Sequence, residues 1–216
     1  MGEWVCMIEP PGLHFEQALW QKGIMYVAGI DEAGRGAWAG PVMAGAVILP
    51  GDACLAEKLS GVRDSKKMTA RQRERWAPVI QSTALAWALG MCSAAEIDQI
   101  GILPANRLAM ARAIDGLALF PEYHLFDFIH WKDCPYTGEK LVKGEQQSLS
   151  IAAASVLAKT ARDELMRAFE FEYPGYGFAR HKGYGTAAHH AAIQSFGLSE
   201  IHRKSFSITT WGRKLA

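Results

Sequence analysis

The amino-acid sequence predicts an α/β protein with a mixed central sheet flanked by helices and a helical C-terminal segment. Two apolar strand-like segments come first, and the connection between them is too short for a crossover helix, so they should be antiparallel neighbours. Strand-like and helix-forming segments then alternate, which is typical of α/β folds. The chain has 216 residues, half of them apolar, which is enough for one domain with a substantial core. We assign residues 24–216 to this domain and residues 1–23 to an N-terminal extension.

Apolar runs and the residues that end them predict the individual elements. Residues 24–30 and 42–49 are nearly continuous apolar runs on either side of a glycine-rich turn, and residues 85–92 and 124–129 give two further strands. Thr69 is the expected N-cap of a helix over residues 69–80. The other expected helices cover residues 14–22, 93–101, 104–119, 148–169 and 186–196. We expect the aromatic residues Trp76, Trp87 and Phe128 to lie in the core.

The composition excludes several classes of protein. Lys and Arg number 23 against 22 Asp and Glu, so affinity for nucleic acid would have to come from a local basic patch. Four cysteines without a C-x-x-C pair argue against a zinc cage and a disulfide framework. Pro10 and Pro11 interrupt the region where a signal peptide needs an apolar run, and no segment is apolar for the length of a membrane span. We therefore expect a cytoplasmic protein with no membrane partner.

Four carboxylates are candidates for catalysis and for metal binding. Asp31 and Glu32 follow an apolar strand directly, Asp127 lies between apolar residues of another strand, and Glu145 precedes a helix. The alternatives are a solvated turn for the first pair and a helix N-terminal acid for Glu145. Carboxylates from separate element ends could converge on hard divalent cations. Two such ions would activate a water and stabilise the leaving oxygen of a phosphodiester, which is the chemistry we favour.

The glycine-rich turn and the basic residues point to a ligand. Gly34 and Gly36 remove side-chain bulk on either side of Arg35, so that a phosphate or a sugar can approach the backbone. Gly34, Gly36 and Ala39 also match the spacing of a dinucleotide-binding loop, but a strand follows here where that loop needs a helix. Basic clusters with interleaved glycines and Tyr184 suit a nucleic-acid groove, although each alone would fit a solvated surface; they are Lys66-Lys67, Arg180-His181-Lys182 and His202-Arg203-Lys204.

Taken in order, these segments resemble the ribonuclease HII family from residue 26 to residue 206. Any one of the matching segments could arise by chance, but the ordered set is highly specific. The matches are GIDEAGRG (29–36), GPV (40–42), DSKKM (64–68), EIDQIGI (96–102), KGE (143–145), IAAASVLAK (151–159) with Arg162-Asp163, and YGFARHKGYGT (176–186).

The resemblance implies a ribonuclease H-like fold and two-metal hydrolysis, with Mg²⁺ or Mn²⁺, that leaves a 5′-phosphate and a 3′-hydroxyl. Asp31, Glu32 and Asp127 match the family's first three metal-binding acids. Arg35 with its flanking glycines matches the turn that senses the 2′-hydroxyl, and Tyr184 matches the tyrosine that stacks on the neighbouring deoxyribose. Lys66, Lys67 and Lys182 belong to the implied substrate-binding set.

The chain departs from the family at two positions. Phe128 follows Asp127 where the family usually has glycine, and Glu145 stands where the fourth acid is usually Asp. Asp163 is the other candidate for that acid, but on one continuous helix it would lie roughly 22 Å from the end near Glu145. We therefore assign Glu145 to the site and interpret Asp163 as a structural ion-pair or surface residue.

Three functions remain as hypotheses. The leading one is a metal-dependent endoribonuclease, expected to be monomeric, that acts on RNA paired with DNA and on ribonucleotides embedded in duplex DNA. The second is a binding protein for RNA/DNA hybrids whose altered fourth acid has removed turnover. The third, a dinucleotide-dependent enzyme, is nearly excluded by the missing helix.

Overall fold

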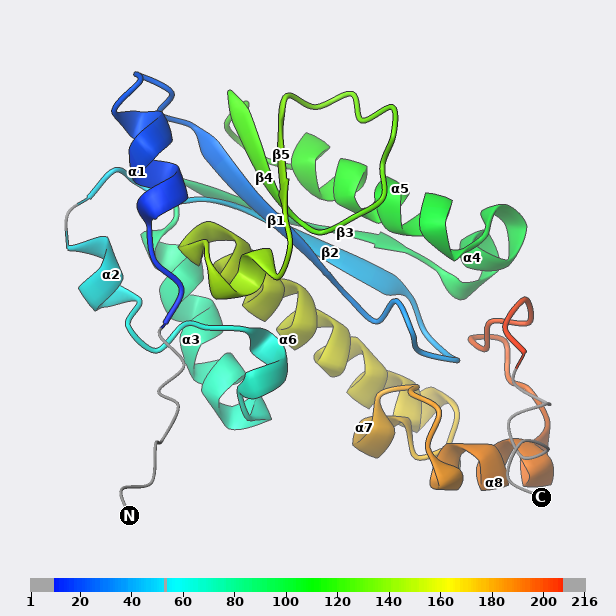
Figure 1. The fold of residues 1–216 in the computed structure, drawn as a ribbon. Helices are drawn as coiled ribbons and strands as arrows, with labels where there is room; N and C mark the ends of the chain where they lie inside the picture. The colour runs from blue at the N-terminus through cyan, green and yellow to red at the C-terminus, as the bar shows by residue number, and fades with distance from the viewer. Residues whose placement is uncertain (1–9, 53, 208–216) are drawn as a thin grey trace, which may run out of the picture.

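A five-stranded mixed sheet forms the centre of the molecule. The computed structural model describes residues 10–52 and 54–207 (Figure 1). The strand order is β3-β2-β1-β4-β5; β2 is antiparallel to β1 and β3, whereas β4 is parallel to β1 and β5. This confirms the mixed sheet and the antiparallel first pair. The strands are β1 (Val27–Ala33), β2 (Val42–Ile48), β3 (Ala86–Cys92), β4 (Tyr123–Asp127) and β5 (Gly138–Leu141), of which β5 was not predicted.

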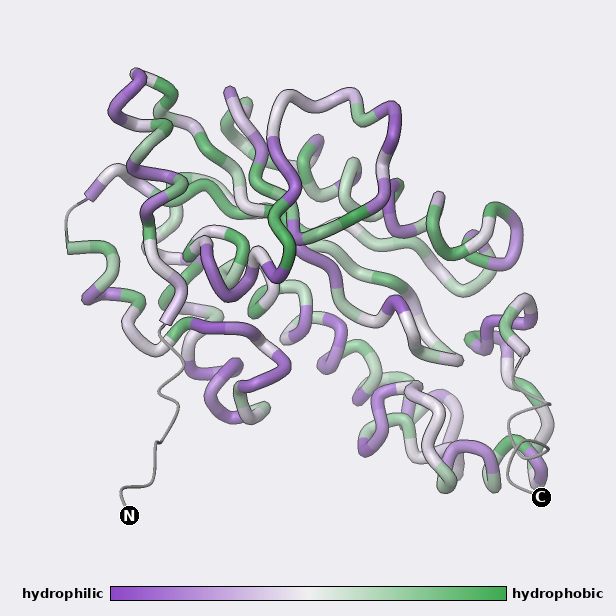
Figure 2. The backbone as a smooth tube through the Cα atoms, viewed as in Figure 1, coloured by the Kyte–Doolittle hydropathy of each residue, from purple (hydrophilic) through white to green (hydrophobic). Residues whose placement is uncertain are grey.

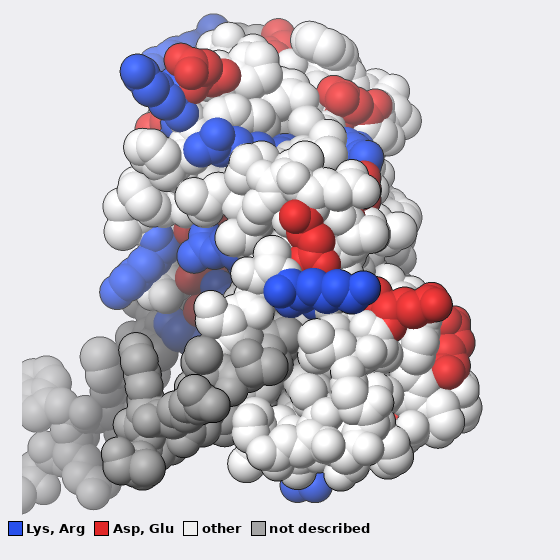
Figure 3. Space-filling view, turned by 90° about the vertical axis from the view of Figure 1, so that its right-hand side faces the viewer, with Lys and Arg blue, Asp and Glu red and all other residues white. Residues whose placement is uncertain are grey.

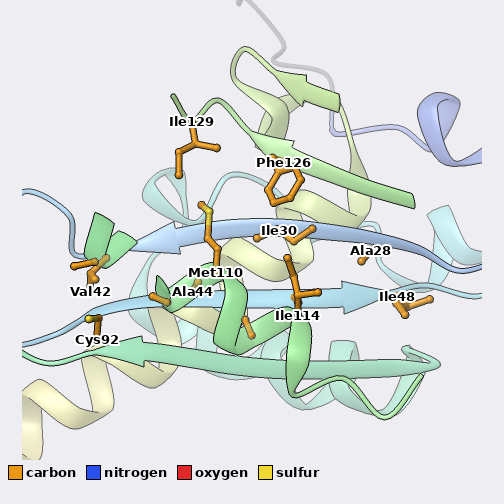
Figure 4. Packing of buried hydrophobic residues seen from close by; sticks show 14 of the residues in the cluster. Ala28, Ile30, Val42, Ala44, Ile48, Cys92, Met110, Ile114, Phe126 and Ile129 are labelled. Atoms are coloured by element: carbon orange, nitrogen blue, oxygen red, sulfur yellow. The ribbon is translucent and has the colours of Figure 1, made fainter. Parts of the chain in front are cut away.

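Helices cover both faces of the sheet. α6 (Leu149–Glu172) packs on one face and α5 (Ile102–Asp115) on the other (Figure 1). A Cβ atom on Gly29 of β1 would lie 2.2 Å from the carbonyl carbon of Ser150, so this glycine lets the start of α6 lie directly on β1. The face under α5 is closed by packed apolar side chains such as Ile30, Met110 and Phe126 (Figure 4). Figure 2 shows the same concentration of hydrophobic residues along the central strands.

The remaining helices lie around this core. Thr69 caps α3 as predicted, in a capping box with Gln72. Within the described residues, no helix is both long and apolar enough to cross a bilayer. These elements are α1 (His14–Trp20), α2 (Leu55–Lys58), η1 (Ser65–Lys67), α3 (Ala70–Thr83), α4 (Ala94–Ile100), η2 (Gly144–Gln146), α7 (Phe178–His181) and α8 (Ala187–Phe196).

The described part of the N-terminal segment packs against the domain. Leu13 and Leu19 are buried in two of its apolar clusters. Glu16 is fully buried, and its Oε1 accepts hydrogen bonds from the hydroxyls of Ser148 (2.6 Å) and Ser150 (2.6 Å). Oε1 also accepts the backbone N–H of Ser150 at 3.0 Å. Helix α1 therefore holds the first turn of α6.

Two aromatic residues lie outside the core in which we expected them. Trp87 is 37% exposed because its side chain alternates outward on β3, the edge strand of the sheet. Phe128 is 57% exposed directly after β4, whereas Trp76 packs partly against a core cluster as expected.

Candidate active site

Asp31, Glu32 and Asp127 are placed by adjacent strands. The sequence predicts that the first strand ends in Asp31-Glu32, and β1 extends one residue further, to Ala33, because its pairing with β2 continues through Glu32↔Ala44 and Ala33↔Met43. Ile30 pairs with Phe126 in the parallel β1–β4 register, so the next residues, Asp31 and Asp127, leave that pairing side by side. Asp31 is 1% exposed and Glu32 is part-buried. The prediction that these acids lie beside the core is confirmed.

Glu145 joins this group through the turn before α6. The backbone N–H of Gly144 donates to Asp127 Oδ1 at 2.8 Å, which fixes the short helix η2 against the end of β4. Ser148 then caps α6 by accepting the backbone N–H of Ile151. Glu145 is 5% exposed, so four acids from three separate segments share one region.

Burial and repulsion from neighbouring acids disfavour the charged forms of Asp31 and Glu145. Burial, followed by the charges of Glu32 and Asp127, raises the pKa of Asp31 well above its ordinary value. Burial and the contact with Asp127 also raise the pKa of Glu145. Lys66 faces the acids: burial lowers the pKa of its ammonium, but the charges of Asp31, Glu145, Asp64 and Asp127 leave it raised overall.

The four acids are incompletely satisfied by the protein alone, and their chemistry suits divalent cations. Glu32 Oε2 and Glu145 Oε2 are buried without a hydrogen-bond partner, and an unpaired buried carboxylate oxygen is costly. The donors are all carboxylate oxygens, which are the ligands of Mg²⁺ and Mn²⁺. Within the described residues, no three Asp, Glu, His or Cys side chains are already close enough together to hold one ion.

A cavity of about 230 Å³ adjoins the acids. The residues that line it come from the end of β1 and the turn after it, from η1, from α6 and from the turn after α7: Glu32, Ala33, Gly34, Arg35, Gly36, Ser65, Lys66, Lys159 and Tyr184. They include five of the seven substrate-binding residues expected from the sequence, namely Gly34, Arg35, Gly36, Lys66 and Tyr184. Arg35 Nη1 lies 3.2 Å from Glu32 Oε1. A Cβ atom on Gly36 would meet open space, so the fold itself does not require glycine there.

Two buried arginines fix the backbone around this cavity. Arg203 donates to the carbonyl oxygens of Gly34 (2.7 Å), Arg35 (2.8 Å) and Gly40 (3.0 Å). Gly34 has a φ of 87°, and a Cβ atom there would lie 1.9 Å from Nε of Arg162. Arg162 in turn donates to three carbonyl oxygens, those of Ala39, Pro41 and Lys182. The turn after β1 is thus held by its backbone, and the half-exposed Arg35 side chain, which pairs with Glu32, is not needed to hold it.

Tyr184 is held from both sides. The Lys159 ammonium lies 5.2 Å and the Arg162 guanidinium 5.4 Å from the centre of its ring. On the other side, His202 Nδ1 accepts the backbone N–H of Ser199, so its Nε2 is the donor to His189 Nε2 at 3.0 Å. His189 must then donate from Nδ1 to the carbonyl of Tyr184 at 3.1 Å.

The structure does not bring every expected residue into this cavity. Lys67 lies 3.9 Å from Asp64 and lines a separate cavity of about 520 Å³, which Glu145 also borders. The Lys182 ammonium donates to the carbonyl of Ala179. Asp163 pairs with Arg73 at 2.8 Å and with Lys159 at 2.7 Å, which confirms its interpretation as a structural ion-pair residue.

Lys159, Arg162 and Arg203 are the residues that sequence reasoning did not assign to the site. All three lie in segments that were recognised, the run 151–159 with Arg162-Asp163 and the basic cluster 202–204. The sequence does not distinguish them from surface cations, whereas in the structure Arg162 and Arg203 are both 0% exposed. The strand β2 after the glycine turn also removes the dinucleotide interpretation, which needs a helix there.

Charge on the surface is mixed in sign. On the face shown in Figure 3, Lys and Arg are interspersed with Asp and Glu among uncharged residues. This agrees with the net charge of +1 and leaves local residues to recognise any polyanion.

Comparison with known proteins agrees with this geometry. Residues 28–209 match the family described as Ribonuclease HII. A Ribonuclease HII of Nitrosococcus oceani is 55% identical over 183 residues, which cover 83% of this chain and 88% of that protein. One of Syntrophotalea carbinolica is 49% identical over 194 residues, which cover 90% of this chain and 91% of that protein.

Solved structures show the same fold. Ribonuclease H2 from Pyrococcus horikoshii OT3 superposes with a TM-score of 0.69 at 25% identity, covering 88% of this chain and 97% of that one. Bst-RNase HIII, solved in complex with Mn²⁺, has a TM-score of 0.69 at 23% identity, covering 92% of this chain and 72% of that one. The predicted ribonuclease H-like fold is confirmed.

Proposed function

The chain belongs to the ribonuclease HII family and is an endoribonuclease, and we propose that it cuts RNA paired with DNA and single ribonucleotides embedded in duplex DNA. The products would carry 5′-phosphate and 3′-hydroxyl ends. One observation supports this most: the cavity of the glycine turn and Tyr184 opens beside the four acids and shares Glu32 with them. The glycine turn and Tyr184, which would contact a sugar, thus lie beside the acids that would hydrolyse the phosphodiester.

We assign Asp31, Glu32, Asp127 and Glu145 as the ligands of two divalent cations, Mg²⁺ or Mn²⁺. When bound, the ions would supply activation of the attacking water and neutralisation of charge on the leaving oxygen. The chain's own contribution is the placement of the carboxylates by β1, β4 and η2. The Lys66 ammonium balances part of the negative charge of the four acids. It also lines the cavity, where it would contact an incoming phosphate.

Recognition of RNA is assigned to the turn and to Tyr184. The backbone of residues 34–36, held by Arg203, would read the 2′-hydroxyl, which is the group that distinguishes RNA from DNA. Arg35 pairs with Glu32 in the free protein, so a substrate phosphate would replace a carboxylate as its partner. Tyr184 would stack on the adjacent deoxyribose, and Lys66, Lys67 and Lys182 would contact phosphates. We propose that the protein acts as a monomer.

A second candidate is a hybrid-binding protein without turnover. It is favoured by Glu145, which stands where the family resemblance leads us to expect Asp. Mg²⁺ tolerates misplaced ligands poorly.

One cleavage assay separates the two. An end-labelled DNA duplex with one ribonucleotide is incubated with the protein and Mg²⁺ or Mn²⁺, with an all-DNA duplex as the control. We expect cleavage only beside the ribonucleotide, and we expect Asp31→Asn to abolish it while folding and duplex binding persist, because the amide keeps the shape but loses the charge. Binding without cleavage in either metal would replace the nuclease proposal by the second candidate.

A further inference from the structure

The aromatic side chain of Phe128 is exposed to solvent and directly follows one of the four acids. Phe128 follows Asp127, the last residue of β4, and is 57% exposed, although the next residue, Ile129, is 3% exposed. Among the described residues, Phe128 belongs to none of the apolar core clusters. Exposing a large ring forgoes the stabilisation that burial would give. The fold therefore does not explain this side chain.

The surroundings of Phe128 combine apolar and cationic side chains. Asp127 pairs with Leu141 in the parallel β4–β5 register, so the next residues, Phe128 and Val142, leave the sheet beside each other. Val142 is 64% exposed, and the exposed Lys143 follows it at a φ of 55°. We call Phe128, Val142 and Lys143 the β4–β5 rim. Apolar surface for sugars and bases next to a cation for phosphates is the combination used in nucleic-acid grooves.

The rim and Tyr184 lie on different sides of the acids. The rim adjoins Gly144 and the start of α6, whereas Tyr184 contacts Lys159, ten residues along that helix. Ten helical residues span roughly 15 Å. A duplex that rests one sugar on Tyr184 and places its scissile phosphate over the acids would extend toward the rim.

We propose that Phe128 is a substrate contact that packs on a sugar–base face of the duplex, on the side of the scissile phosphate away from Tyr184. Lys143 would meet a phosphate of the same flank. This inference rests on the proposed function, and it is particular to this chain because the resemblance leads us to expect glycine at position 128. The second contact would compensate for the imperfect fit of Glu145 by fixing the phosphate from both flanks.

The test measures binding separately from cleavage. Affinity for a duplex with one ribonucleotide is measured by fluorescence anisotropy in Ca²⁺, and KM and kcat in Mg²⁺, for the full chain and for Phe128→Gly, Phe128→Ala and Phe128→Tyr. Phe120→Ala is the matched control, since Phe120 is 89% exposed just before β4, at the opposite end of that strand. We expect Phe128→Gly and Phe128→Ala to weaken binding and raise KM roughly tenfold, with Phe128→Tyr close to wild type.

A series of shortened duplexes identifies the flank. Trimming the duplex on the side away from Tyr184 should remove the difference between wild type and Phe128→Ala, whereas trimming the other side should keep it. Equal affinities for wild type and folded Phe128→Ala would overturn the inference. A shift of the Mg²⁺ midpoint without a change in affinity would also overturn it, because Phe128 would then act through Asp127. If wild type binds but does not cleave, the proposed function fails while the Ca²⁺ binding data still decide the role of Phe128.

Discussion

Two buried acids near α6 have opposite surroundings. In η2, just before α6, Glu145 is 5% exposed, lies against Asp127 and has a buried oxygen without a partner. In the middle of α6, Asp163 is 4% exposed but is held by Arg73 and Lys159. Burial alone does not separate the proposed metal ligand from the ion-paired acid. Their partners differ, because Asp163 is neutralised by two cations whereas Glu145 lies against another carboxylate.

The largest expected effect is that of Glu145→Gln. Loss of one carboxylate charge from the ion-binding group should reduce Mg²⁺-dependent cleavage by at least about a hundredfold. The same change relieves repulsion from Asp127, so the melting temperature of the metal-free protein should rise. Glu145→Asp should be active, and a metal titration with cleavage and thermal melts for each variant tests these statements.

The converse variant, Asp163→Asn, should mainly affect stability. It leaves Arg73 and Lys159 without a full negative partner, which should cost roughly 3 kcal/mol of unfolding free energy. Cleavage per folded molecule should fall far less than in Glu145→Gln. Denaturant unfolding and active-site-normalised rates check this. A folded but inactive Asp163→Asn beside a fully active Glu145→Gln would reverse the assignment.

Tyr184→Ala tests the proposed substrate contact that lies beside the middle of α6. The ring lies beside Lys159 and Arg162, so its loss should change the position of the nucleic acid more than the fold. We expect cleavage at a single ribonucleotide to fall by up to about a hundredfold, and binding to fall less. Single-turnover rates and anisotropy measure the two quantities. Unchanged junction cleavage would mean that another residue reads the boundary.

The smallest effects should appear in the pH dependence of stability, with opposite signs in two regions. The raised pKa values of Asp31 and Glu145 mean that the folded state holds protons that the unfolded chain has released. Raising the pH above about 4 should therefore destabilise the metal-free protein until those folded-state pKa values are passed. Excess Mg²⁺ should reduce this loss, as thermal melts at each pH would show.

Burial instead lowers the pKa values of His189 and His202 to about 4. The unfolded chain binds these protons first, so lowering the pH from 6.5 toward 4 should destabilise the C-terminal helices. Hydrogen exchange should show faster opening of α8 in that window. Protection of α8 that stays constant between pH 6.5 and pH 4 would contradict the neutral histidine pair.

Local patterns were sufficient for most elements and for the residues of the site. Apolar runs located β1 to β4, and Thr69 located the start of α3, because these signals lie within a few neighbouring residues. The motif around Asp31 to Gly36 indicated both a metal site and a close ligand approach. The distance along the helix from its start, near Glu145, to Asp163 was also enough to interpret Asp163 as an ion-pair residue, which its contacts with Arg73 and Lys159 confirm.

The tertiary structure decided what depends on distant partners. β5 is a strand only because Leu141 and its neighbours pair with β4, and β1 continues to Ala33 only because β2 continues beside it. Trp87 and Phe128 are exposed because one lies on an edge strand and the other follows a strand end, positions that sequence hydrophobicity does not encode. Arg162 and Arg203 became site residues because the fold surrounds each with three backbone carbonyls. Five of these six arginine hydrogen bonds join residues more than a hundred positions apart, and a single sequence carries no local signal of them.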